Sequence, residues 1–400
     1  MKYSHLSVAV PMLAERENLP RLLDALYGQT VRNFTLYCCV NNREGWNDDG
    51  DDGHRSSYLD NQASLEYLHS YQMLHPDLQL VIFDHSTVGK GWQGKQHGVG
   101  WARKVIFDAI ASKASDNEVI VSLDADTAFG STYLESVLEA FNGHPEHSAL
   151  CLPYYHPLSG NDIDDRAMLR YEVYMRHYLI SLWGSGNPYA FTALGSAMAF
   201  PLWAYKKVGG ITPLQGGEDF YLMQKFAKTG KILLHCRETV RPQGRASLRV
   251  PFGTGPAIAK GIDSMDDTYP LYPAEGFRAI ADTYALFPRL YNEDVETPMS
   301  DFLRQQLKTD DLWQPLRKNF KTRELFVHAC TERVDGLRIL QFLKSFQLRP
   351  AEEELLLLCN KHYISTPSGF SFRKSTIMEI NSVRDAIFKL ECGLRKRVLY

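Results

Sequence analysis

The stretch VIVSLDADT, Val119 to Thr127, decides the fold class of this chain. It begins as a short β-branched apolar run, which is typical of a strand buried on both faces. It ends in two acids, Asp124 and Asp126, with one residue between them. Because side chains at i and i+2 of an extended segment point the same way, both carboxylates can reach one hard divalent cation. The stretch therefore indicates a buried strand with a polar site at its carboxyl end.

Three apolar runs precede this strand and alternate with helical sequence. Strands are expected at His5 to Met12, Phe34 to Val40 and Leu78 to Asp84, and helices at Leu19 to Leu26 and at 98–112. Such β-α-β alternation predicts an α/β fold, Rossmann-like, with a mainly parallel central sheet flanked by helices on both faces.

Polar segments follow each expected strand. They are Pro11 to Glu17, Asn41 to Asn42, Gly89 to Lys95 and Asp124 to Thr127. Ligands of parallel sheets bind beyond the carboxyl ends of the strands, so these four segments are expected to converge on one rim. The long connection from Arg43 to Asp77 is expected to carry an exposed acidic turn and a helix, because its NDDGDDG segment does not fit a calcium loop.

Composition bounds the function. The chain has 400 residues, 44% of them hydrophobic, and its 44 basic and 47 acidic residues give a net charge of −3, which argues against a general nucleic-acid-binding surface. Cys38 and Cys39 stand in an apolar run and are expected to be buried thiols of a reducing compartment. Neither a signal peptide nor an apolar run of membrane-spanning length is apparent. A cytoplasmic location is expected, free or peripheral to the inner face of the membrane.

The glycine-rich segment GKGWQGKQ, Gly89 to Gln96, differs by one residue from a nucleotide-binding phosphate loop. In that loop a Ser or Thr follows the lysine, because its hydroxyl holds Mg²⁺. Here Gln96 follows Lys95, so the motif that a triphosphate hydrolase requires is incomplete. DADT also resembles the DxDxT of haloacid dehalogenase-type phosphatases, but that motif ends the first strand, and here three expected strands come before it.

A second acidic pair, Glu218 and Asp219, opens an amphipathic helix after two glycines. Acids at this place are stabilised by the positive end of the helix macrodipole, which is a purely structural reason for their presence. A carboxylate held beside a bound sugar can also take the proton from an attacking hydroxyl as a general base. A third segment, Arg241 to Gly261, holds four cations among glycines and suits a lid over a diphosphate or an ordinary basic surface loop.

Five segments in fixed order resemble the family 2 inverting glycosyltransferases of the GT-A fold. They are VAVPMLAERENL (Val8 to Leu19), CVNN (Cys39 to Asn42), VGKGWQGKQHGVGWA (Val88 to Ala102), VIVSLDADT, and LGSAMAFPLWAYKKVGGI (Leu194 to Ile211) followed by GGEDFYLMQKFAKTG (Gly216 to Gly230). The resemblance covers about Ser4 to Ser247. It implies an enzyme that moves one sugar from a nucleotide-diphosphate sugar to a saccharide, lipid-linked or protein acceptor, as in the synthesis of cell-envelope polysaccharides.

The resemblance also implies roles for single residues. Pro11 and Glu15 would line the base and ribose of the donor, with Asn41 at the position that contacts the base, and Lys90 and Lys95 would lie near the donor. Asp124 would touch the ribose or the metal, and Asp126 would bind Mg²⁺ or Mn²⁺. Asp219 would be the general base and Glu218 a contact to the acceptor, while Lys95 or Arg245 would share the charge of the leaving diphosphate.

Two departures from the family pattern bear on the substrate. Asn41 and Asn42 stand where members commonly have two aspartates, the first of which contacts uracil, so the nucleobase is open. The QxxRW motif of processive relatives is missing, and RPQGRAS, Arg241 to Ser247, stands near its place. A non-processive transferase is therefore expected. A phosphoryl-transfer enzyme and a non-catalytic sugar-nucleotide-binding protein of the same fold are the alternatives.

The chain is expected to divide into a catalytic domain at 1–265 and a mainly helical region at 266–400. In the last helical string Ile380, Val383 and Ile387 repeat at steps of three and four, and Arg395 to Arg397 end it. Because its polar face mixes both signs of charge, we expect this stripe to pack against the catalytic domain, and a helix for a membrane surface or for a partner is the alternative. Trp313 is expected in the core.

Overall fold

The chain forms two compact units in the computed structural model, which describes residues 3–244, 254–263 and 269–398. The first unit comprises Met1–Met168, Ala193–Ala259 and Leu394–Tyr400, and the second comprises Leu169–Thr192 and Lys260–Gly393. Both units are thus built from segments that are not consecutive in the chain. The division expected at residues 265 and 266 stays a prediction.

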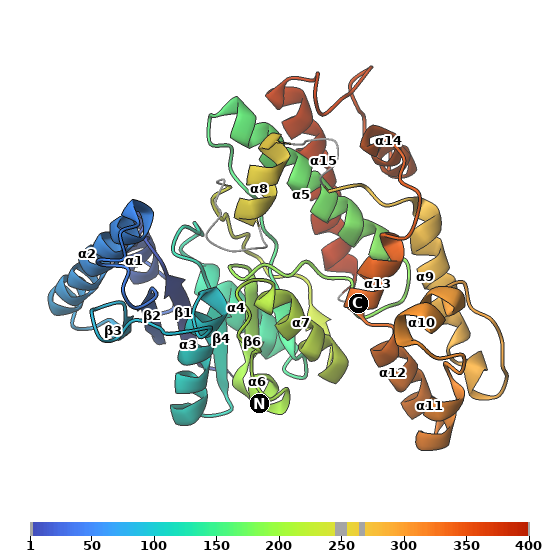
Figure 1. Ribbon diagram of the computed structural model, residues 1–400, viewed down its shortest axis with the longest axis horizontal. Coiled ribbons are helices and arrows are strands. Elements are labelled where there is room, and N and C mark those ends of the chain that lie inside the picture. The colour runs from blue at the N-terminus through green and yellow to red at the C-terminus, as the bar shows by residue number, and fades with distance from the viewer. Residues whose placement is uncertain (1–2, 245–253, 264–268, 399–400) are drawn as a thin grey trace. The chain divides into compact units, whose positions relative to one another are not determined.

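A seven-stranded sheet forms the centre of the first unit within the described residues (Figure 1). Its strands are β1 (His5–Met12), β2 (Phe34–Asn41), β3 (Gln79–His85), β4 (Glu118–Ser122), β5 (Ala149–Cys151), β6 (Met198–Pro201) and β7 (Ile232–Leu233), in the order β3-β2-β1-β4-β6-β5-β7. The first four strands run parallel, and β6 runs antiparallel to β4 and β5. The expected α/β fold with a mainly parallel sheet is confirmed. The sequence did not indicate β5, β6 or β7, because runs of two to four residues are too short to show a period.

Helices cover the sheet and follow the strands. They are α1 (Leu19–Tyr27), α2 (Asp52–Leu74), α3 (Val99–Lys113), α4 (Tyr133–Gly143), α6 (Leu202–Lys207) and α7 (Glu218–Thr229), while α5 (Asp162–Trp183) and α8 (Thr254–Asp263) run from one unit into the other. In α1 the side chains of Leu19, Leu22, Leu23 and Leu26 are all buried. Each such leucine contributes about 1.5–3 kcal/mol of apolar burial, so this stripe fixes the helix in place.

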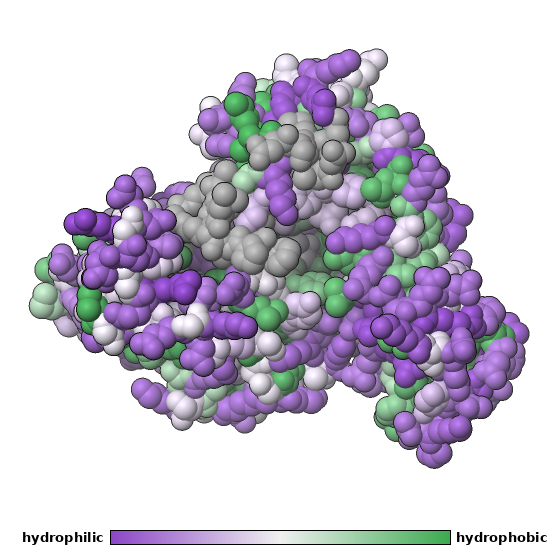
Figure 2. All heavy atoms as spheres, in the orientation of Figure 1, coloured by the Kyte–Doolittle hydropathy of each residue, from purple (hydrophilic) through white to green (hydrophobic). Residues whose placement is uncertain are grey.

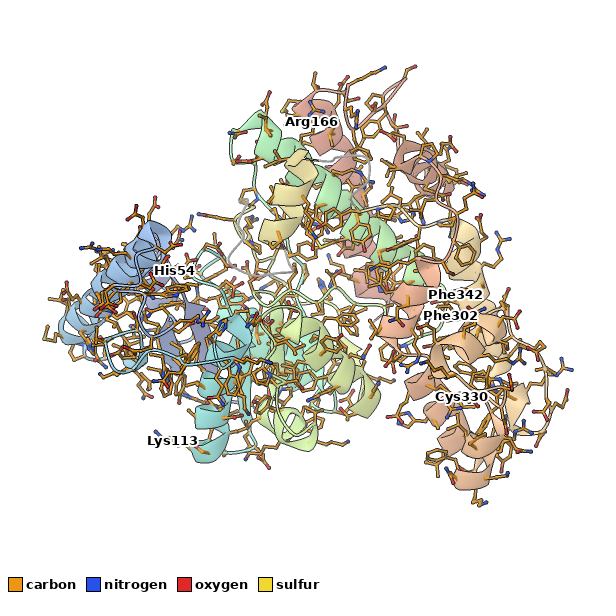
Figure 3. All side chains as sticks on the ribbon, in the orientation of Figure 1. His54, Lys113, Arg166, Phe302, Cys330 and Phe342 are labelled. Atoms are coloured by element: carbon orange, nitrogen blue, oxygen red, sulfur yellow. The ribbon has the colours of Figure 1, made fainter. Side chains whose placement is uncertain are left out.

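The second unit is helical. It holds α9 (Ala274–Leu286), the 3-10 turn η1 (Arg289–Tyr291), α10 (Ser300–Leu307), α11 (Gln314–Asn319), α12 (Arg323–Arg333), α13 (Gly336–Leu343), α14 (Ala351–Lys361) and most of α15 (Ile377–Val398). Phe302 of α10 and Phe342 of α13 face each other with ring centroids 5.3 Å apart (Figure 3). Trp313 is buried, as expected. The surface over α10 to α12 is mainly hydrophilic in the view of Figure 2.

Charged side chains lie in the core of the second unit. Arg176 of α5 is fully buried and pairs with Glu172 on its own helix and with Glu391 of α15. Arg384 of α15 also pairs with Glu172, at 3.0 Å. The stripe of α15 at Ile380, Val383 and Ile387 is buried as expected. None of the helices within the described residues combines the length and the apolar character needed to cross a membrane.

Candidate active site

The parallel strands β1 to β4 bring their carboxyl ends to one edge of the sheet. β1 pairs with β2 as far as Met12 and Val40, and β2 pairs with β3 as far as Asn41 and His85. The amide of Leu123, just after β4, donates to the carbonyl of Ala9 in β1 at 3.0 Å. The segments that follow these strands therefore lie along a common rim, as the alternation of strands and helices predicted.

A buried arginine joins the two acidic segments at this rim. Arg103, from the second turn of α3, is 3% exposed and reaches Asp124 with Nη2 at 2.6 Å from Oδ1. Its Nη1 pairs with the Glu218 carboxylate, 115 residues away in the chain, at the start of α7. Burial would lower the pKa of Arg103, but Asp124 and Glu218 raise it, so the guanidinium stays charged. The DADT and GGED segments thus meet at one cation.

The surroundings of Arg103 fix the position of its guanidinium. Nε donates to Oγ of Ser122 at 3.2 Å, and that hydroxyl donates to the carbonyl of Gly195 at 2.7 Å. A β-carbon on Gly195 would stand 2.1 Å from Nη2 of Arg103, so only glycine leaves room for the arginine. We define Arg103, Asp124, Glu218 and Asp219 as the arginine cluster.

The two acids of α7 have different surroundings. Glu218 is 2% exposed and lies on Arg103, whereas Asp219 is half-buried and bonds the amide of Phe220 at 2.7 Å. Burial and the neighbouring Glu218 carboxylate raise the pKa of Asp219 to about 7, against the opposing charge of Arg103. Asp219 is therefore the acid of this pair that solvent reaches, and it can accept a proton near neutral pH. The expected contact of Glu218 with an acceptor stays a prediction.

Asp124 and Asp126 suit a hard divalent cation in their chemistry. Both side chains are partly exposed in the turn after β4, where the amide of Thr127 bonds the carbonyl of Asp124 at 3.1 Å. Asp124 gives one oxygen to Arg103 and keeps the other. Mg²⁺ and Mn²⁺ sites of nucleotide-processing enzymes use one or two carboxylates and complete their coordination with water and phosphate oxygens. The pair fits such an ion together with a diphosphate.

A network of amide side chains joins the ends of three strands. Asn61 of α2 is fully buried, and its Oδ1 accepts from the amide of Ala14 after β1 at 2.8 Å. Its Nδ2 donates to the carbonyl of Asn41 at 3.0 Å and to Oδ1 of Asn42 at 2.9 Å after β2. Oγ of Ser86, after β3, donates to the same Oδ1 of Asn42. The helix of the long connection therefore holds the rim together.

The glycine segment forms an anion-binding turn that one of the chain's own carboxylates fills. Glu44 accepts from the amides of Gly89 and Gly91 at 2.9 and 2.8 Å. The amide of Glu44 in turn donates to the carbonyl of Trp92 at 2.9 Å. A β-carbon on Gly91 would lie 2.7 Å from the backbone of Glu44, which explains the glycine there. We call Glu44 with Gly89 to Trp92 the glutamate-filled loop.

The lysines of this region differ in their partners. Lys90 Nζ lies 2.8 Å from Oδ2 of Asp84. Burial would raise the pKa of Asp84, but hydrogen bonds from Lys90, Thr87 and Ser86 lower it to about 2, so the pair is charged. Lys95 is exposed. Lys90 is exposed as well, so the two predicted lysines differ in the carboxylate partner of Lys90 and not in their access to solvent.

The other predicted donor residues lie near the rim. Pro11 is buried in β1, two residues after Ala9, where the pairing of β1 with β4 ends. The backbone nitrogen of Pro11 is on the β4 side, beyond that pairing, so the lack of an N–H costs the sheet no hydrogen bond. Glu15 is nearly buried and accepts from Asn18 at 2.6 Å. Asn41 is buried, and its side-chain nitrogen donates to the carbonyl of Met12 at 2.8 Å. Their contacts with a nucleotide stay predictions.

The basic segment begins beside the DADT turn. The backbones of Arg241 and Ala128 bond each other twice, at 2.8 and 2.9 Å, so Arg241 lies two residues from Asp126 in register. Arg245, which we expected at the leaving diphosphate, lies outside the described residues. Arg395 near the end of α15 is buried and donates to the carbonyls of Cys151 and Leu234. The basic run from Arg395 to Arg397 is therefore not exposed throughout.

Sequence reasoning missed three residues that the structure places at this rim: Arg103, Asn61 and Glu44. Arg103 had a signal, because it lies on the apolar stripe of its helix with Ile106 and Ile110, where an unpaired cation is too costly. A cation on such a stripe predicts a buried carboxylate partner. Asn61 and Glu44 had no comparable signal, since polar residues in a long connection are common.

Comparisons with known proteins give structural similarity only. No family model and no curated protein matches the chain. TarS from S. aureus, solved in complex with UDP-GlcNAc, is similar at 13% identity over 98% of this chain and 92% of that one, with a TM-score of 0.42. The mannosyltransferase PcManGT from Pyrobaculum calidifontis, solved with GDP-Man and Mn²⁺, is similar at 14% identity over 98% and 88%, with a TM-score of 0.41.

A third similar structure covers less of the chain. It is the glucosyl-3-phosphoglycerate synthase of Mycobacterium tuberculosis in complex with Mn²⁺, UDP and glucosyl-3-phosphoglycerate, at 14% identity over 58% of this chain and 69% of that one, with a TM-score of 0.34. All three structures were solved with a sugar nucleotide or with a nucleoside diphosphate.

Proposed function

We propose that the first unit is a glycosyltransferase that moves a sugar from a nucleotide-diphosphate sugar to an acceptor hydroxyl with inversion at the anomeric carbon. The observation that supports it most is the pair of contacts from Arg103 to Asp124 and to Glu218. These contacts support the proposal because they connect Asp124, one member of the spaced acid pair, with Glu218, the chain neighbour of Asp219. That is the arrangement which a displacement at a sugar carbon needs.

The proposed reaction is one displacement. The half-buried Asp219 carboxylate takes the proton of the acceptor hydroxyl, and the hydroxyl oxygen attacks the anomeric carbon of the donor sugar. The bond between that carbon and the diphosphate breaks at the same time. A single attack from the face opposite the leaving group inverts the stereochemistry. Glu218 neutralises much of the charge of Arg103, and its own charge raises the pKa of Asp219. Asp219 is thereby kept a stronger base than an exposed aspartate.

Asp126, with the free oxygen of Asp124, would hold Mg²⁺ or Mn²⁺ against the diphosphate of the donor. A cation there supplies charge neutralisation for the leaving group. The chain itself contributes orientation, because Arg103 fixes Asp124 and the bond from Arg21 to the carbonyl of Asp126, at 3.0 Å, holds the turn. Lys95 and Arg245 are candidates for further positive charge near the diphosphate.

The glutamate-filled loop bears on the alternative of a phosphoryl enzyme. A phosphate loop must offer its amides to the nucleotide, and here the amides of Gly89 and Gly91 are bonded to Glu44. No observation in this structure favours nucleotide hydrolysis over sugar transfer.

A panel of UDP-, GDP- and dTDP-sugars, each titrated calorimetrically with and without Mn²⁺, tests the proposal. The wild-type chain is expected to bind one donor class, more tightly with Mn²⁺, and Asp126→Ala is expected to lose the metal-dependent part. Asp116→Ala, at an exposed acid before the amino end of β4 and therefore at the opposite end of that strand from Asp126, is the matched control. Hydrolysis of nucleotide without any acceptor would support the phosphoryl enzyme, and binding without turnover on a broad acceptor panel would support the non-catalytic protein.

A further inference from the structure

A group of metal-ligating side chains lies in the turn between α4 and β5. Among the described residues, His144, Glu146 and His147 form the one group of three whose ligand atoms all lie within 4.8 Å of one another. Nδ1 of His147 is 3.0 Å from Oε1 of Glu146, and the two imidazole centroids are 5.3 Å apart. Tetrahedral zinc with bonds of about 2.0–2.1 Å sets its ligand atoms roughly 3.4 Å apart, so small rotations of these side chains suffice.

The contact between His147 and Glu146 is not an adequate hydrogen bond. Nδ1 of His147 is a buried atom without a hydrogen-bond partner, although Oε1 of Glu146 lies 3.0 Å from it. A buried polar atom left unpaired destabilises the folded chain, because it has lost water without gaining a partner. A cation bound by both the ring nitrogen of His147 and the carboxylate of Glu146 would give each of them a partner.

The turn that carries these ligands is fixed from both sides. The amide of Tyr3 donates to Oδ1 of Asn142 at 2.7 Å, and its hydroxyl donates to the carbonyl of Pro145 at 3.2 Å. The amide of His147 donates to the carbonyl of His144 at 3.2 Å. On the other flank the amide of Ser148 bonds the carbonyl of Lys231 at 2.9 Å. Little conformational entropy is left to lose when an ion binds.

This turn lies at the opposite edge of the sheet from the arginine cluster. β5 is antiparallel to β6, which is antiparallel to β4, so β5 and β4 run the same way. The turn before β5 is therefore at the amino ends of the strands, whereas Asp124 and Asp126 follow the carboxyl end of β4. The five residues of β4 separate the two edges by about 16 Å. An ion at one edge does not touch a donor bound at the other.

From these observations we propose that His144, Glu146 and His147 bind one divalent transition-metal ion, of which Zn²⁺ is the natural choice. Two imidazoles and one carboxylate are a zinc ligand set, and they leave a fourth position for water. Imidazole nitrogen also selects against Mg²⁺ and Ca²⁺, which prefer oxygen ligands. The ion ties the end of α4 to the start of β5 and is separate from the cation proposed at Asp126.

Calorimetric titration with Zn²⁺ of the full chain carrying Asp124→Asn and Asp126→Asn tests this site without the competing carboxylates. One Zn²⁺ per chain is expected, with affinity at least about tenfold weaker after His147→Asn, since loss of even an outer partner of a metal ligand costs about that much. Co²⁺ is the spectroscopic probe, because its visible absorption reports tetrahedral coordination. That absorption should disappear in the same variant.

Two further variants separate ligand loss from misfolding. Glu146 has a side chain that is 66% exposed, so Glu146→Gln keeps the fold and should weaken Zn²⁺ binding as His147→Asn does. His328→Asn is the matched control, because His328 pairs with Glu332 at 3.7 Å on an exposed helix face, where the described residues offer no third ligand. It should leave Zn²⁺ affinity unchanged. Unaltered affinity in either Glu146→Gln or His147→Asn would overturn the three-ligand site.

Discussion

The glutamate-filled loop and the arginine cluster each include a residue that was expected to meet a sugar-nucleotide donor, Lys90 and Asp124, and they differ in what the chain itself supplies. In the loop, the amides of Gly89 and Gly91 that could bind an anion already bind Glu44. In the cluster, one cation, Arg103, gathers carboxylates from two distant segments. Glycines in a sequence indicate where backbone amides are accessible, but they do not indicate which anion binds those amides. Spaced acids reveal a site only together with the cation that holds them.

The largest effect expected in the cluster is that of Asp219→Asn. Removal of a general base typically slows a reaction by about 10²–10⁴-fold, so transfer should fall by that factor while calorimetric donor binding is retained. Asp108→Asn, at an acid on the exposed side of α3, serves as the control and should keep full turnover. Unchanged turnover of the Asp219 variant would remove it from the reaction.

Arg103→Met tests whether the cluster is held by its cation. The substitution leaves the buried Glu218 carboxylate without a partner, so the free energy of unfolding should fall by about 3–5 kcal/mol in chemical denaturation. Arg32→Met removes the cation of an exposed pair with Asp77 and should cost less than about 1 kcal/mol. Equal losses in the two variants would mean that Arg103 contributes no more than a surface arginine.

The pH dependence of transfer is expected to follow Asp219. A base acts in its unprotonated form, and its pKa is raised to about 7, so kcat/KM should fall about tenfold per unit as pH drops below that value. A pH series of initial rates with saturating metal measures this fall in kcat/KM. In Glu218→Gln the neighbouring negative charge is gone, so the fall should begin at a lower pH. A fall that begins at the same pH in the variant would assign the titration to another group.

The smallest effect is expected in the loop. Glu44→Gln weakens two charge-assisted hydrogen bonds on a partly exposed side chain, so the local loss should be about 1 kcal/mol. Faster hydrogen exchange at the amides of Gly89 and Gly91 measures it, with Glu66→Gln on the exposed face of α2 as control. ATP hydrolysis should remain absent in the variant. Its appearance would show that the carboxylate had been masking a phosphate loop.

The two regions also differ in how much of their structure could be predicted from the sequence. The four parallel strands and the convergence of their polar ends were predicted, because burial on both faces leaves a continuous apolar run and parallel strands share an edge. The resemblance implied that Asp124, Asp126 and Asp219 serve one site, yet it did not indicate the arginine that pairs with Asp124 and Glu218. The sequence of α3 indicates that Arg103 needs a carboxylate partner. It does not indicate which carboxylate, because the partner is decided by tertiary packing.

Asn61 has a practical consequence for anyone who would shorten this protein. The connection from Arg43 to Asp77 resembles a dispensable surface insertion, and closing a shorter loop would be cheap in chain entropy. Yet one amide from its helix bonds Ala14, Asn41 and Asn42 at once. Trimming that segment would free the ends of two neighbouring strands together, so a deletion made for convenience should blunt substrate binding well before it unfolds the chain.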